Sequence, residues 1–323
     1  MKTKFFYLAL AVMTAFCTTA CSSDDDDNND GGVGGGKSAI VTPKHADEAC
    51  KITPTTPIDL GSGYKVTDIE MSESGRCHFI MKDPGDETRA VSGNYTYSDG
   101  VYNVKGKTLN AVVEVKSKTR AEEGVNLIIT VTLIIDGETL TYNTDIDGGI
   151  SAIKVISASK GGDSDLISTW KVRTKTSDGM PAGLLIDLKG DVNVFKTFSG
   201  GDLRNIRNEA EAQGAEFTAE ERKDFEKTLT YVTFSKDYLT LDYDDGTSDC
   251  GTWDWAGSEA KKFNMKMLSA DMGNKFIVTN TTGALEFDKA NGFLNVTLNA
   301  DITGSKNYKA TLTIQLEQAP DVK

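Results

Sequence analysis

The feature that most constrains the fold is a regular succession of short segments rich in β-branched and aromatic residues. Each segment ends in a polar turn, and Asp136-Gly137 between two such segments is typical of a β-hairpin. Short strands with turns at intervals of about 8–12 residues predict an antiparallel sandwich or barrel. The clearest strand segments of this first region are residues 79–81, 95–97, 101–104, 109–115, 125–135 and 139–144.

A second β region follows, with a helical segment inside it. Residues 202–213 and 218–229 carry helical patterns, and Thr218 with Glu221 forms a capping box. Eight or more antiparallel strands in one domain are about the number that closes a small barrel. The predicted strands of this region begin at Trp170 and continue at residues 231–234, 238–243, 251–255, 263–268, 275–279, 284–287, 292–298 and 308–316.

Changes in composition divide the chain. Residues 157–165 (SASKGGDSD) are typical of a linker. We therefore predict an all-β protein with two antiparallel β domains, residues 45–156 and 166–323, the second a small barrel with an inserted helical hairpin. Residues 21–44, dominated by Asp, Asn, Gly and Ser, are predicted to be a disordered tether.

The two β regions share a short pattern. Gly93-Asn-Tyr95-Thr-Tyr97 and Gly251-Thr-Trp253-Asp-Trp255 each follow a strand and an acidic turn. Because side chains alternate along a strand, both rings of each pair lie on one face. A duplication explains the echo, and so does chance; the sequence leaves both open.

Residues 1–20 are typical of a secretory signal. Lys2 and Lys4 precede an apolar run at residues 5–16, which is too short to span a bilayer as a helix of about 20 residues. Small residues then lead to Cys21, so the segment resembles a bacterial lipoprotein signal with a lipobox. The resemblance implies a lipid on Cys21 as the membrane anchor.

The acidic run that follows the cysteine carries a further resemblance. Asp24, Asp25, Asp26 and Asp27 are similar to the surface-export signal of Bacteroidota lipoproteins. The resemblance implies an outer-membrane protein that is lipid-anchored and faces the cell exterior.

The second β region resembles the lipocalin-like domains of Bacteroidota lipoproteins. The resemblance rests on the Trp170 strand, the segment ending at Phe234, the Asp245-Gly246-Thr247 turn and Gly251-Thr-Trp253. It implies a small antiparallel barrel opened by a tryptophan strand. It implies little about activity, because one fold hosts many functions.

The net charge argues against nucleic acids as partners. Removing residues 1–20 takes away two lysines and no acid, so the formal charge goes from −13 to −15. Such a charge disfavours nucleic acids. Residues 31–38, from Gly31 to Ser38, match the P-loop pattern G-x-x-x-x-G-K-S, but no strand precedes them and no helical pattern follows. We predict that they bind no nucleotide.

The cysteines suggest one disulfide. Of five, Cys17 is lost with the signal and Cys21 takes the lipid, which leaves Cys50, Cys77 and Cys250. Cys50 and Cys77 are the natural pair in an oxidising compartment. The alternative is that Cys77 is a small buried hydrophobe, and no partner is predicted for Cys250.

The sequence carries few candidates for chemistry. It has only two histidines, His45 and His78, and no motif of a hydrolase or a zinc site, so we predict no catalytic residue, no metal and no cofactor. Trp170, Trp253 and Trp255 are the candidate ligand-binding residues, because such rings stack on sugars or apolar cofactors. The alternative is that they fill the barrel core.

Three hypotheses for function follow. The first is a non-catalytic surface lipoprotein that captures a glycan or a hydrophobic cofactor for outer-membrane uptake, with a TonB-dependent transporter as partner. The second is a structural or adhesive, fimbrillin-like subunit, which would need a displaceable strand such as residues 308–316. The third is a glycoside hydrolase built on paired carboxylates.

We expect that replacing Asp24, Asp25, Asp26 and Asp27 with alanine leaves the lipoprotein facing the periplasm. The acidic run is the only part of the tether that resembles an export signal. Protease digestion of intact cells measures the outcome, with replacement of the Asn28-Asn29 pair as the control. Unchanged accessibility of the aspartate variant to protease would contradict the expectation.

Overall fold

A computed structural model provides the fold of the chain. It describes residues 50–72, 74–117, 125–135, 138–146, 150–155, 169–190, 193–212, 217, 219–223, 225–235, 237–256, 262–267, 277–288, 291–303 and 307–319. The predicted signal, the tether with Cys21 and the four aspartates, the segment at 31–38 and the linker at 157–165 lie outside these residues.

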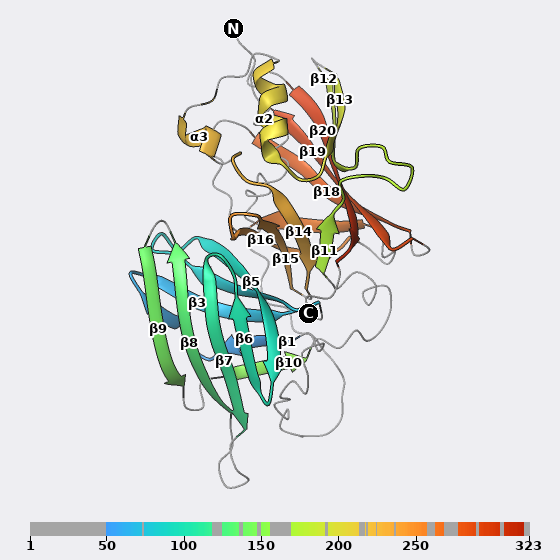
Figure 1. Ribbon diagram of the computed structural model, residues 1–323. Coiled ribbons are helices and arrows are strands. Elements are labelled where there is room, and N and C mark those ends of the chain that lie inside the picture. The colour runs from blue at the N-terminus through green and yellow to red at the C-terminus, as the bar shows by residue number, and fades with distance from the viewer. Residues whose placement is uncertain are drawn as a thin grey trace.

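Most of the described chain is β-strand, as predicted, and forms two groups of strands (Figure 1). The first strand group contains β1 (Cys50–Pro54), β2 (Ile58–Gly61), β3 (Tyr64–Met71), β4 (Arg76–Lys82), β5 (Thr88–Ser98), β6 (Val101–Lys105), β7 (Leu109–Ser117), β8 (Val125–Ile135), β9 (Glu138–Ile146) and β10 (Ile150–Val155). The second contains β11 (Thr169–Val172), β12 (Gly183–Gly190), β13 (Val194–Ser199), α2 (Leu203–Ala212), α3 (Ala219–Lys223), β14 (Leu229–Phe234), β15 (Tyr238–Tyr243), β16 (Thr247–Trp255), β17 (Lys262–Met267), β18 (Ile277–Asp288), β19 (Phe293–Thr303) and β20 (Asn307–Gln318).

The first strand group is an antiparallel meander. Each strand from β3 to β8 pairs with the next, β1 and β2 both pair with β3, and β10 pairs with β1. Alternating burial gives the group an inner face: in β6, Tyr102 and Val104 are buried while Asn103 is exposed. The apolar side chains of this inner face form the core of the first strand group.

The second strand group contains a closed eight-stranded antiparallel barrel. Strands β14 to β20 form a meander, and β11 pairs with both β14 and β20 and so closes the ring. The predicted barrel is confirmed. Closure leaves no open edge within the ring. The β12–β13 hairpin extends the sheet from the other end of β20.

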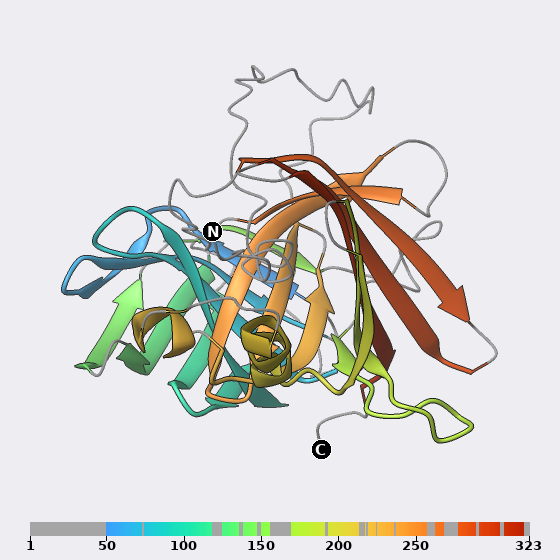
Figure 2. The same cartoon turned by 90° about the horizontal axis from the view of Figure 1, so that it is seen from above.

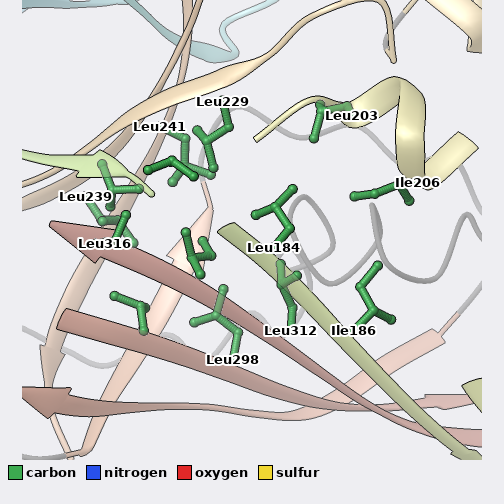
Figure 3. Packing of buried hydrophobic residues seen from close by; sticks show 14 of the residues in the cluster. Leu184, Ile186, Leu203, Ile206, Leu229, Leu239, Leu241, Leu298, Leu312 and Leu316 are labelled. Carbon is green, nitrogen blue, oxygen red and sulfur yellow. The ribbon is translucent and has the colours of Figure 1, made fainter. Parts of the chain in front are cut away.

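Large apolar side chains fill the interior of the barrel (Figure 3). Leucine and isoleucine residues from β12, β14, β15, β19 and β20 point toward one another. Helix α2 adds Leu203 and Ile206, which face Leu184 and Ile186 of β12. The helix thus covers one end of the barrel with its apolar face. In the part of the chain that the structure describes, no helix has the length and apolar character needed to cross a membrane.

The helical segment differs in part from its prediction. Helix α2 matches residues 202–213 closely, and Asp202 caps it by accepting a hydrogen bond from the backbone N–H of Arg204. Helix α3 ends at Lys223, well before the predicted residue 229, because Phe225 and Leu229 leave the helical path to enter the core. The predicted capping residue Thr218 lies outside the described residues.

The β12–β13 hairpin was not predicted from the sequence. Its signal was present: Leu184, Ile186 and Leu188 alternate with more exposed residues and are buried. The hairpin lies between the short strand β11 and helix α2. The prediction of a simple meander therefore had no place for it.

The strand register overturns the predicted Cys50–Cys77 disulfide. Cys50 of β1 and Cys77 of β4 both lie opposite Met71 of β3, on its two sides. Their Cα atoms are therefore two strand spacings apart, roughly 9–10 Å, whereas a disulfide needs less than about 7 Å. The alternative is correct: Cys77 is buried in the core of the first strand group.

We expect Leu203→Ala to lower the free energy of unfolding by about 2–5 kcal/mol, because it leaves a cavity where α2 meets the barrel core. Asn208→Ala, at an exposed position of the same helix, is the control and should change it by less than about 0.5 kcal/mol. Chemical denaturation measures both values. Equal effects of the two substitutions would show that α2 does not seal the barrel.

Candidate functional site

The two strand groups meet along a contact that we call the seam. It is formed by the outer faces of β4 and β5 in the first group and of β15 and β16 in the second (Figure 1). β5 and β16 pair antiparallel at two positions, Val91 with Thr247 and Ala90 with Ser248. At one edge, Thr108 Oγ1 donates a 2.6 Å hydrogen bond to the carbonyl of Gly246.

A buried carboxylate lies at the centre of the seam. Asp242 of β15 has no exposed surface, and its partners come mostly from β4. Arg76 donates to it through Nη2 at 2.7 Å and Nε at 3.2 Å, and Nε2 of His78 lies 3.1 Å from both carboxylate oxygens. Ser248 Oγ donates at 2.7 Å. These groups form the Asp242 cluster.

The guanidinium of Arg76 is fully engaged in this cluster. Its Nη1 donates to Asn94 at 2.7 Å and its Nη2 also donates to Ser92 at 2.8 Å. Its planar face lies over the ring of Tyr231, with 5.1 Å from Cζ to the ring centroid. Arg76 therefore connects β4, β5, β14 and β15.

The environment of Asp242 stabilises its charged form. Burial alone would raise the pKa of this carboxyl, but the charges of His78 and Arg76 and the hydrogen bonds from His78 and Ser248 outweigh it and hold the pKa well below its usual range. Asp242 therefore stabilises the fold above the pKa of an unfolded aspartate, about 3.9. That stabilisation is lost as the pH falls through the lower pKa of the folded state.

A second cluster, the Glu70 cluster, lies beside the first. Lys51 Nζ lies 2.9 Å from Asp237 Oδ2 of the second strand group and 3.4 Å from Asp68 Oδ1 of the first. Tyr238 donates its hydroxyl across the seam to Asp68 at 2.8 Å. Glu70 lies directly opposite Lys51 in the β1–β3 register and is enclosed among these side chains.

Glu70 is held in its protonated form. Burial is the main cause that raises its pKa to about 8, and the negative charges of Asp237 and Asp68 add to it. A hydrogen bond with Ser235 and the charge of Lys51 act in the opposite direction but are weaker. Its Oε1 is buried and has no hydrogen-bond partner among the described residues. Ionisation would place a buried charge there that Lys51 and Ser235 compensate only in part.

An apolar cluster completes the seam. Ile80, Ala90 and Cys250 are buried together, with Tyr238 packed against them. Burial raises the pKa of the Cys250 thiol, and the charges of Glu70 and Asp249 add to the effect. Cys250 is therefore a buried thiol, and burial is the main cause that disfavours its thiolate form.

A cleft of about 420 Å³ opens beside the seam, between the two strand groups. Figure 2 shows α3 on the side of the molecule that faces the first strand group. The cleft is lined by residues of both groups and of the segment around α3: Glu87, Arg89, Ala90, Val91, Thr108, Ile134, Ile135, Lys223, Lys227, Asp245, Thr247, Ser248 and Asp249.

The two sides of the cleft differ in chemistry. The first strand group supplies most of its apolar surface, including Ile134, whose side chain is 43% exposed. The second group and the α3 segment supply Lys223, Lys227, Asp245 and Asp249, which include both donors and acceptors of hydrogen bonds. The volume is within the range of about 300–1,000 Å³ that is typical of small-molecule sites.

The sequence-predicted tryptophans lie in the barrel rather than at the cleft. Trp170 is buried with its ring edge-to-face against Phe287, and Trp253 packs edge-to-face on Trp255, 5.2 Å away. Trp253 Nε1 also donates to the carbonyl of Ser235 at 2.9 Å. All three rings pack in or against the barrel core. Their contact with a ligand stays a prediction.

The predictions from the sequence did not include the cleft or the two polar clusters. His78, one of the two histidines of the sequence, lies in β4 and contacts Asp242. A signal for the seam was present in Arg76 and His78, two basic residues within an otherwise apolar strand. Their partner Asp242 is more than 160 positions away in the chain, and only the fold brings them together.

The chain matches no protein-family model, no curated protein and no solved structure. The geometry of the seam and the cleft is therefore the basis for the functional argument below.

We expect the free energy of unfolding to decrease as the pH rises from about 5 to about 8, because folded Glu70 retains a proton that an unfolded glutamate, with a pKa of 4.5, releases. This group contributes a slope of up to about 1.4 kcal/mol per pH unit. Glu70→Gln should remove that part of the slope, and Glu286→Gln, on the exposed face of β18, should not. Denaturation at several pH values measures the slopes; parallel profiles for wild type and Glu70→Gln would refute the assignment.

Proposed function

We propose that this chain is a lipid-anchored, non-catalytic binding protein of the cell surface that captures an oligosaccharide in the cleft between its two strand groups. The observation that carries the proposal is the cleft itself, which combines apolar side chains of the first strand group with charged hydrogen-bonding groups from both groups.

The chemistry of a sugar suits these two sides. A pyranose ring has an apolar face of C–H groups and an edge of hydroxyls that both donate and accept hydrogen bonds. The apolar face would pack on Ile134 and Val91, while hydroxyls would meet Lys223, Asp245 and Glu87. Ligand sites combine an apolar surface with a few directed polar groups in this way.

The filled barrel argues against the other predicted ligand, a hydrophobic cofactor. Such a ligand would need space among the apolar side chains of the barrel. Those side chains pack against one another, and Leu203 and Ile206 of α2 cover one end (Figure 3). A polar ligand bound outside the barrel fits the arrangement better.

The location is part of the proposal. The lipid on Cys21 would anchor the protein in the outer membrane, and Asp24, Asp25, Asp26 and Asp27 would direct it to the outer face. The two strand groups would act as two domains that present the cleft to the medium. A TonB-dependent transporter would take up the captured ligand.

The structural-subunit hypothesis gains no support. Its displaceable strand, residues 308–316, belongs to β20, which pairs with β19 along one edge and with β12 and β11 along the other. Removing β20 would open the barrel. A hydrolase would have to use the carboxylates of the cleft, Glu87, Asp245 and Asp249. The buried carboxyl groups of the seam, Asp68, Glu70 and Asp242, are enclosed and inaccessible to a polysaccharide.

We expect the full-length protein, purified in detergent, to bind one member of a panel of plant and host oligosaccharides in titration calorimetry. Ile134→Asn should weaken that binding about tenfold, because it removes an apolar contact worth about 1.4 kcal/mol.

The matched control is Val112→Asn. Val112 is also an aliphatic side chain on the outer face of the first strand group, with 41% exposure, but it does not line the cleft. It should leave binding unchanged. The absence of binding across the panel, or equal losses in the two variants, would refute the proposal.

A further inference from the structure

One hairpin of the first strand group corresponds to one hairpin of the second. In the first, Gly93-x-Tyr95-x-Tyr97 lies on β5, and Gly93 is opposite Cys77 of β4. In the second, Gly251-x-Trp253-x-Trp255 lies on β16, and Gly251 is opposite Leu239 of β15. The β4–β5 hairpin therefore matches the β15–β16 hairpin in order, direction and register.

This register gives each seam residue a counterpart in the other group. On β4 and β15 the counterparts are Arg76 and Tyr238, His78 and Thr240, and Ile80 and Asp242; on β5 and β16 they are Ala90 and Ser248, and Ser92 and Cys250.

Two contacts join a residue to its own counterpart. Ala90 pairs with Ser248 in the β5–β16 ladder, and Nε2 of His78 lies 3.1 Å from Oγ1 of Thr240. Two copies of one unit make such self-contacts only on a two-fold axis. The seam therefore has a pseudo-two-fold axis that passes through these two contacts.

Contacts on the two sides of the axis also involve corresponding residues. The buried positions of the Asp242 cluster on one side, Arg76, Ser92, Asp242 and Ser248, correspond to Tyr238, Cys250, Ile80 and Ala90 on the other. The second set is the apolar cluster. Corresponding positions thus hold polar side chains on one side of the axis and apolar side chains on the other, as expected for a duplicated unit whose two copies have diverged.

The cleft lies on this axis. Along β5 and β16 and the residues just before them, Glu87, Arg89 and Val91 have Asp245, Thr247 and Asp249 as counterparts, and all six line the cleft. The floor of the cleft is therefore built twice from equivalent positions.

One wall breaks the symmetry. Lys223 and Lys227 come from α3 and the turn after it, in the insertion between β11 and β14. By register β11 corresponds to β1, because Trp170 lies opposite Val232 as Ile52 lies opposite Ile69. The equivalent connection in the first group, from β1 to β3, holds only the short strand β2 and its turns. No counterpart of these two lysines exists there.

Most charged groups of the cleft are already engaged. Arg89 Nε lies 2.7 Å from Asp83 Oδ2. Asp249 accepts a 2.6 Å hydrogen bond from the hydroxyl of Tyr243, and Asp245 accepts from the backbone and hydroxyl of the residue two positions later.

The lysines of the insertion are not neutralised. Lys227 Nζ lies 3.7 Å from the centroid of the Tyr243 ring, and within the described ranges neither Lys227 nor Lys223 has a carboxylate within 4.0 Å. Glu87 is the one carboxylate of the cleft without a side-chain partner among these residues. Asp245 and Asp249 accept hydrogen bonds from neutral donors and keep their negative charge. Of the three cations that line the cleft, Arg89 has a carboxylate beside it and the two lysines do not, so the lysines can pair with a negative group of a ligand.

We propose that Lys223 and Lys227 are the specificity-determining residues of the cleft and that its ligand is an acidic oligosaccharide, with a uronate carboxylate bound between the two ammonium groups. This rests on the proposed function and names its substrate class. The residues along β5 and β16 would hold the sugar rings, and the two lysines of the insertion would select ligands that carry a negative charge.

The test compares the full-length protein with trigalacturonate and with neutral galactotriose, which differ in the C6 carboxylate. In calorimetry at low salt, wild type should bind the acidic sugar at least about tenfold more tightly. The Lys223→Gln/Lys227→Gln variant should lose that preference and keep its affinity for the neutral sugar. Lys105→Gln/Lys262→Gln, at exposed positions outside the cleft, should behave as wild type.

The outcomes separate the two proposals. Equal affinity of wild type for the two sugars, or a preference that survives in Lys223→Gln/Lys227→Gln, would overturn this inference while leaving an oligosaccharide-binding cleft in place. Failure of wild type to bind either sugar or any member of the wider panel would overturn the proposed function and this inference together. Unfolding curves that coincide for all three proteins exclude a folding defect as the cause.

Discussion

The arrangement of this protein depends on one buried carboxylate, Asp242. An unpaired charge without solvent contact costs several kcal/mol, so the fold must supply partners, and it supplies them from the other strand group: Arg76 and His78 of β4. A buried ion pair of this kind contributes more to a single orientation than to net stability. It holds the outer faces of the β4–β5 and β15–β16 hairpins together, and the cleft exists because they are held there.

The barrel explains why the candidate site lies outside it. Eight strands enclose a space that side chains can fill, and here Trp170, Trp253 and the apolar face of α2 contribute to filling it. With the interior used for stability, the surfaces left for a ligand are those between the strand groups. The pseudo-two-fold relation places equivalent residues on both sides of that space, and the α3 segment adds the one wall that differs.

Local sequence patterns predicted much of the fold but not the seam. Alternating apolar residues predicted most strands and the closed barrel, because burial on one face of a strand repeats every second residue. Helix α2 was found by its own period, and α3 was predicted too long because Phe225 and Leu229 are drawn into the core. The predicted Cys50–Cys77 disulfide was wrong because two cysteines of one domain need not lie on neighbouring strands. Cys50 and Cys77 lie opposite Met71 on its two sides, with β3 between them.

The sequence by itself determined most of the strands and their antiparallel order, and residues 1–27 resemble the start of an exported lipoprotein; each of these depends on neighbours within a few residues. Only the tertiary structure decided that Asp242 meets Arg76 and His78, that Glu70 is buried in the seam, and that Lys223, Lys227 and Ile134 line one cleft. These pairs are distant in the chain, so their contact depends on how two complete sheets pack, and no local pattern encodes it.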